Sequence, residues 1–89
     1  MKNKVLIKLV FLELDEVFDV FIPVNEVIWK IKKMLLKSIS DLTNVPVDLK
    51  LEYVLLNEKN GRIYRNNEII INTDIRNASE LVMFSNKNN

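Results

Sequence analysis

The side chains of this sequence that could do chemistry are carboxylates, lysines and hydroxyls, because it contains no histidine and no cysteine. The commonest general base, the thiol nucleophile and the best ligands for soft metals are therefore missing. Asp15 and Glu16 are adjacent and could form a paired-carboxylate site. They lie in a predicted tight turn, however, where solvated acids are the usual occupants. We expect no catalytic site at this pair.

The other acidic residues and Ser79 show no stronger pattern of a catalytic or metal site. Asp41, Asp48, Glu52 and Glu58 lack the spacing of metal ligands. Ser79 is expected to make local hydrogen bonds in a turn rather than to act as a nucleophile. We therefore predict that the protein is not an enzyme and binds no metal and no cofactor.

Lysines are concentrated in one stretch, at Lys30, Lys32, Lys33 and Lys37. They could contact phosphate or an acidic partner, or they could form the solvated face of a helix. Thirteen basic and twelve acidic residues give a net charge of +1, so no global field attracts nucleic acid. We expect no nucleic-acid partner.

Length and composition predict one small soluble domain. The chain has 89 residues, 48% of them hydrophobic and 28% charged, which suits a single compact core. Lysines precede the first apolar run, as in a signal peptide, but Lys8 interrupts that run and no small-residue cleavage site follows. No stretch approaches the ~20 apolar residues of a membrane span. We expect one domain over residues 1–89, with an ordered core at about 4–84, in the cytoplasm and without direct membrane insertion.

The predicted elements begin with a β-hairpin, because apolar residues recur at every second position in two neighbouring runs. These residues are Val5, Ile7, Leu9 and Phe11 in residues 4–13, and Phe18, Val20 and Ile22 in residues 17–24. Pro23 should end the second strand because proline has no N–H for a ladder. A helix should follow, with Asn25 as its N-cap. Its expected apolar stripe is Val24, Ile28, Ile31, Leu35 and Ile39.

Three further strands are predicted after the helix, at residues 49–57, 62–65 and 79–84, with a turn at Gly61. The order is β-β-α-β-β-β. One amphipathic helix on one face of a mixed sheet of four or five strands would cover both apolar surfaces. The fold class is therefore α+β. The first and last strands could lie side by side in the middle of this sheet.

Three segments in this order resemble the ubiquitin-like β-grasp superfamily. They are the passage into the helix, "PVNEVIWKIKKML", the exit from it, "VPVDLKLEYVL", and the close, "TDIRNASELVMF". The resemblance covers residues 4–84. Within the superfamily, the chain looks most like the small bacterial ubiquitin-like proteins of type VII secretion loci, the YukD/EsaB group. The resemblance implies an accessory role in type VII secretion, with components of the secretion machinery as partners.

The last residues, "SNKNN", bear on how such a protein would work. Ubiquitin-like proteins that are conjugated, or that carry sulfur, use a flexible C-terminal diglycine. Here the only glycine is Gly61. We therefore expect a non-conjugating adaptor that binds other proteins. The alternative is a small auxiliary subunit of a multicomponent monooxygenase-type complex, since small β-grasp proteins also accompany such enzymes.

Two surfaces are the candidates for protein interaction. The first is the outward face of the hairpin, which could bind a partner or a second copy of the chain, or could be covered by a loop. The second is a flank of the helix, where the tryptophan could complete the edge of the core or serve as an exposed anchor. The predicted interaction residues are Leu6, Val10, Val17, Phe21, Trp29 and Leu36.

Overall fold

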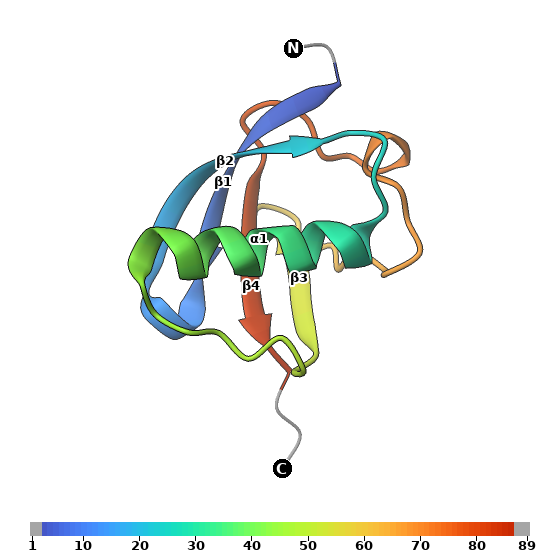
Figure 1. The fold of residues 1–89 in the computed structure, drawn as a ribbon. Helices are drawn as coiled ribbons and strands as arrows, with labels where there is room; N and C mark the ends of the chain where they lie inside the picture. Colours follow the sequence, from blue (N-terminus) through green and yellow to red (C-terminus); the bar gives the residue numbers. More distant parts are fainter. Residues whose placement is uncertain (1–2, 87–89) are drawn as a thin grey trace.

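The computed structural model describes residues 3–86, which form one helix packed against a mixed four-stranded sheet. The strands are β1 (Lys4–Phe11), β2 (Glu16–Pro23), β3 (Tyr53–Asn57) and β4 (Glu80–Ser85). The helix α1 spans Ile28–Thr43, and short 3-10 helices lie at Leu12–Leu14 and Ile70–Asn72. Figure 1 shows α1 crossing one face of the sheet. The α+β architecture predicted from the sequence is confirmed.

The sheet has the strand order β2-β1-β4-β3, so the first and last strands are its central pair. β1 runs parallel to β4, with Leu9 in register with Leu81. The two outer strands are antiparallel to their neighbours. This places the two strands most distant in sequence next to each other, as the sequence suggested.

The core lies between the sheet and α1 and follows the predicted alternation. The four odd-numbered apolar side chains of β1 are all buried, and Leu9 is completely inaccessible. Ile22 of β2 is buried with them, while Phe18 and Val20 pack partly buried against the same core. The helix contributes Ile28, Ile31, Leu35, Leu36 and Ile39.

The beginning of α1 differs from the prediction. The helix starts at Ile28, and its N-cap is Val27 rather than the predicted Asn25. Distant backbone supplies the cap: the Ile28 N–H donates to the carbonyl of Glu68 at 2.8 Å, and the Trp29 N–H donates to that of Asn66 at 3.1 Å. The first helical N–H groups must find partners outside the helix, and here a loop from the second half of the chain provides them.

The strands after the helix are also shorter than predicted. β3 begins at Tyr53 rather than at residue 49, because Asp48 forms a turn by accepting the Lys50 N–H on its Oδ1 at 2.9 Å. The strand expected at residues 62–65 is only an isolated bridge between Ile63 and Leu56. The predicted turn at Gly61 is present, with φ of 73°.

Candidate protein-interaction surface

A row of apolar side chains crosses the face of the sheet that α1 leaves open. Val17 of β2 is paired with Val10 of β1, Val10 is in register with Val82 of β4, and Val82 is paired with Leu56 of β3. The bridge to Ile63 extends this row beyond β3. Paired residues on adjacent strands point to the same face and lie close together. We call Val10, Val17, Leu56, Ile63 and Val82 the outer row.

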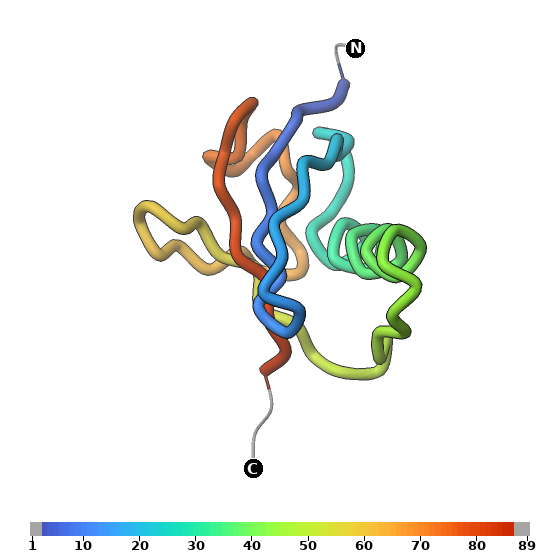
Figure 2. Tube along the Cα trace, turned by 90° about the vertical axis from the view of Figure 1, so that its left-hand side faces the viewer, coloured from blue at the N-terminus to red at the C-terminus, as the bar shows by residue number. Residues whose placement is uncertain are grey.

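The hairpin end of this face is open to solvent. Val17 is 55% exposed and Phe21 is 60% exposed, while Leu6, paired with Phe21, is 38% exposed. The connection between β3 and β4 does not bury them. The turn after β3 projects on the side of the sheet away from α1 (Figure 2). Ile63 in this turn is 62% exposed. Because the outer row joins these exposed side chains across the sheet, the face carries a contiguous apolar patch of the kind that marks interaction surfaces.

Charged residues lie between the apolar pairs of the hairpin. Lys8 and Asp19 are opposite each other, with Lys8 Nζ 3.7 Å from Asp19 Oδ1. Both side chains are at least half exposed, so this ion pair contributes little to stability. Glu80 of β4 is in register with Lys8. The face therefore combines apolar area with a central pair of opposite charges, which can set the orientation of a partner.

The outer row contains residues that the sequence did not single out. Val10 and Val17 were predicted, but Leu56, Ile63 and Val82 were not. The signal was present in β4, where Leu81 and Met83 are buried and Val82 points the other way. The row could be assembled only once the register between β1 and β4 was known.

The two helix residues predicted to bind a partner differ in exposure. Trp29 is 44% exposed, and the ammonium groups of Lys30 and Lys33 lie 5.5 Å and 5.7 Å from its ring centroid. Leu36 is only 3% exposed and belongs to the core. It was expected beside Trp29 on an accessible flank, but the segment before β3 lies over this part of α1 and shares a hollow with it. Leu36 can therefore support a surface but cannot by itself bind a partner.

A polar cluster holds the connection between β3 and β4 in place. The Tyr64 hydroxyl donates to Asp74 Oδ1 at 2.5 Å, and Arg62 Nη2 donates to Glu68 Oε2 at 2.7 Å. Burial, together with the bond to Asp74, raises the pKa of Tyr64 to about 12. The Tyr64 hydroxyl in turn lowers the pKa of Asp74. The cluster fixes the segment that carries Ile63 of the outer row.

The acidic residues and the serine considered as chemical candidates occupy turns. Asp15 and Glu16 are exposed at the hairpin turn, where Asp15 adopts a left-handed conformation with φ of 51°. Ser79 Oγ accepts the Arg76 N–H at 2.8 Å, which confirms its predicted local role. Within residues 3–86, no three acidic side chains gather into a group that could hold a metal ion. In the same range, α1 is too short and too polar to cross a membrane.

The fold is that of ubiquitin-like proteins. The chain superposes on the ubiquitin-like domain of an Arabidopsis thaliana protein with a TM-score of 0.64 and 20% identity, over 96% of this chain and 80% of that one. No protein-family model matches the sequence, and no curated protein matches it. The likeness therefore defines a ubiquitin-like α+β fold.

Two other solved structures are similar over nearly the whole chain. One is a chain of an ESX-5 inner membrane complex, with a TM-score of 0.79 and 12% identity over 98% of this chain. This protein matches only 22% of that chain's length. The other is a chain of a toluene 4-monooxygenase complex, with a TM-score of 0.74 and 7% identity, over 92% of this chain and 98% of that one.

Proposed function

We propose that this protein is a ubiquitin-like adaptor that binds other proteins through the outer face of its sheet, is not conjugated to them and catalyses no reaction. The observation that carries this proposal is the outer row, which runs across all four strands and stays open to solvent at the hairpin end. Residues 1–89 would act as one domain. The contact residues would be Leu6, Val10, Val17 and Phe21, together with the rest of the outer row.

We further propose that the adaptor is an accessory or regulatory component of a bacterial type VII secretion system, working on the cytoplasmic side of the membrane. The sequence resemblance to the YukD/EsaB group supports this assignment. The similarity to one part of an ESX-5 inner membrane complex also supports it.

An auxiliary subunit of a multicomponent monooxygenase is the second candidate. A specific observation favours it: the matching chain of the toluene 4-monooxygenase complex is covered over 98% of its length. That chain is thus a protein of the same size and fold, whereas the ESX-5 chain is much longer.

Affinity purification from the native host, in mild detergent and followed by mass spectrometry, distinguishes the two assignments. Recovery of an export ATPase or other secretion components supports the type VII assignment. Recovery of oxygenase subunits replaces it with the second candidate. A preparation containing only this chain, with a dimer mass by light scattering, contradicts both and indicates self-association instead.

The purification should be repeated with two variants matched in chemistry. Phe21→Asp places a charge on the outer face, and Leu42→Asp places the same charge on α1, where Leu42 is 69% exposed. We expect Phe21→Asp to lose the partner and Leu42→Asp to retain it. Equal recovery with both variants would contradict the outer face as the binding surface.

A further inference from the structure

A second surface lies on the opposite layer of the molecule, where the N-terminal half of α1 meets the segment leading into β3. A hollow of about 180 Å³ opens there. Its apolar lining includes Trp29, Leu36, Leu49 and Leu51. Leu49 is 55% exposed and Leu51 is 38% exposed, because the turn at Asp48 keeps them out of β3. Typical small-molecule sites are ~300 Å³ or larger, so the hollow suits one side chain of a peptide better than a cofactor.

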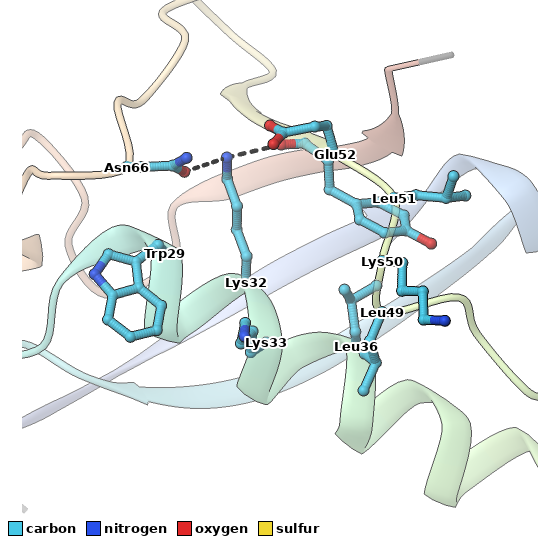
Figure 3. Close-up of a pocket in the computed structure, with 10 residues that line it drawn as sticks. Trp29, Lys32, Lys33, Leu36, Leu49, Lys50, Leu51, Glu52 and Asn66 are labelled. Atoms are coloured by element: carbon cyan, nitrogen blue, oxygen red, sulfur yellow. Dashed lines mark hydrogen bonds between the residues drawn. The ribbon is translucent and has the colours of Figure 1, made fainter.

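Lys32 spans the mouth of this hollow. Its Nζ donates to the carbonyl of Tyr53 at 2.7 Å and to Asn66 Oδ1 at 2.8 Å (Figure 3). An ammonium group has three N–H donors, so these two acceptors leave one donor for a ligand. Burial lowers the pKa of Lys32, against the attraction of Glu52. A carboxylate bound here would therefore stabilise a charge that the fold partly desolvates.

Three of the four charged residues that line the hollow are cationic. Lys32, Lys33 and Lys50 line it, and within residues 3–86 Glu52 is the only carboxylate that does so. A second hollow, of about 250 Å³, adjoins it across the Lys32–Asn66 bond and adds Arg65, with no further acid from the part of the chain that the structure describes. Among residues 3–86, neither Lys33 nor Lys50 takes part in an ion pair. This concentration of positive charge is local, because the whole chain carries only +1.

From this combination we infer that the hollow between α1 and β3 binds an acidic peptide segment of a partner protein, in which one aliphatic or aromatic residue is flanked by aspartates or glutamates. The apolar side chain enters the hollow against Trp29 and Leu49, and the flanking carboxylates meet Lys32, Lys33 and Lys50. Charge complementarity of this kind sets specificity and speeds association. The site is concave with a cationic rim, unlike the flat apolar face with which helices lie on membranes.

The inference goes beyond the proposed function, since it concerns the helix side of the molecule rather than the outer face of the sheet, and a different chemistry. Experiments can contradict either proposal while supporting the other. A variant of the outer face, such as Phe21→Asp, should bind an acidic peptide as well as the unaltered protein does. A variant of the hollow should leave binding by the outer face intact.

Trp29 makes the test direct because it is the only tryptophan of the chain and lies in the hollow. Its fluorescence would be followed while the capped peptide EEDLEE is added at low ionic strength. The peptides EEDSEE and QQNLQQ remove the apolar residue and the charges, respectively. We expect EEDLEE to shift the emission and to bind about tenfold or more tightly than either control, and to weaken as salt is raised.

Two double variants separate a local site from a general attraction. Lys33→Glu/Lys50→Glu reverses two charges of the hollow, while Lys37→Glu/Lys59→Glu makes the same change in net charge outside it. We expect the first to weaken binding of EEDLEE about tenfold or more and the second to change it less than about twofold. Circular dichroism of both variants checks that the fold is retained.

Three results would overturn the inference. Equal weakening by the two double variants would mean that only net charge matters. An emission spectrum unchanged by saturating peptide would mean that the hollow is not occupied. A shift produced by phosphatidylglycerol vesicles but not by the peptide would identify the surface as a membrane contact instead.

Discussion

The two faces of the sheet are made from similar side chains, yet one holds the protein together and the other remains available. Leu9 and Leu6 illustrate this on a single strand: Leu9 is inaccessible beneath α1, whereas Leu6 is 38% exposed on the outer face. In β4, Met83 and Val82 show the same contrast. An apolar residue in a strand therefore reveals its role only when the covered face is known. The position of one helix decides which half of the apolar residues forms the core.

The largest expected effect comes from truncating the same residue type on the two faces of β1. Leu9→Ala should lower the free energy of unfolding by about 2–5 kcal/mol, because it leaves a cavity in the core. Leu6→Ala should cost less than about 1 kcal/mol, since much of this side chain is already in water. Urea unfolding followed by circular dichroism measures both. Similar losses for the two variants would mean that the outer face is also packed.

The next largest effect on stability concerns a buried polar side chain. Thr73 is buried, and its Oγ1 donates to the Ile70 carbonyl at 2.7 Å and accepts the Ile75 N–H at 3.1 Å. Thr73→Val should cost about 1–3 kcal/mol, because it leaves a buried N–H without a partner. Lys8→Met, which removes the exposed ion pair of the outer face, should cost less than about 1 kcal/mol. A larger loss in Lys8→Met than in Thr73→Val would contradict the comparison.

A smaller loss of stability should appear at high pH, where Tyr64 ionises. Tyr64 and its neighbour in sequence, Ile63, differ in burial. Ile63 points outward, while Tyr64 is buried with a pKa of about 12, above its ordinary value near 10. A raised pKa in the folded state means that the neutral phenol stabilises the fold below pH ~10 and that this contribution is lost as the pH rises towards ~12.

This pH dependence can be measured by urea unfolding at pH values of about 9 and 11.5, with Tyr64→Phe as the control. The unaltered protein should lose more stability between the two values than the variant does. Absorbance near the tyrosinate band should also show Tyr64 ionising late. Equal losses in protein and variant would assign the alkaline sensitivity to other groups.

The smallest change in stability is expected on the outer face itself. Phe21→Asp replaces a side chain that is 60% exposed, so the free energy of unfolding should change by no more than about 0.5 kcal/mol. Recovery of the partner should nevertheless fall strongly. Thermal unfolding and affinity purification of the same preparation provide both values. A variant that unfolds easily would show that Phe21 serves the fold and not a partner.

Periodicity was sufficient to predict the covered face but not the points where distant segments meet. The alternation in β1 and the stripe through Ile28, Ile31, Leu35 and Ile39 reflect burial within single elements, so they could be read locally. The start of α1 could not, because its cap comes from the backbone of Asn66 and Glu68 rather than from Asn25.

The candidate surfaces were predictable to different degrees, because some depend on local patterns and others on contacts between distant segments. Val17 and Phe21 belong to one hairpin, whose register follows from a short turn. Leu56, Ile63 and Val82 join them only through pairings between remote strands. Leu36 was expected at the surface, but the turn at Asp48 places the segment before β3 over it. The cationic hollow depends on this turn as well: the lysine stretch of α1 is visible in the sequence, but Leu49 and Lys50 join it only through the turn.

The central pairing of β1 with β4 also has a consequence for biosynthesis. Leu9 and Leu81 are partners across almost the full length of the described chain, so the middle of the sheet cannot form until residue 81 has left the ribosome. Until then, the edge of β1 that β4 will occupy is unpaired as well as the outer edge of β2, and unpaired edges are templates for aggregation. Non-local pairing of this kind slows folding. The nascent chain therefore keeps an open strand edge until its last strand can close the sheet.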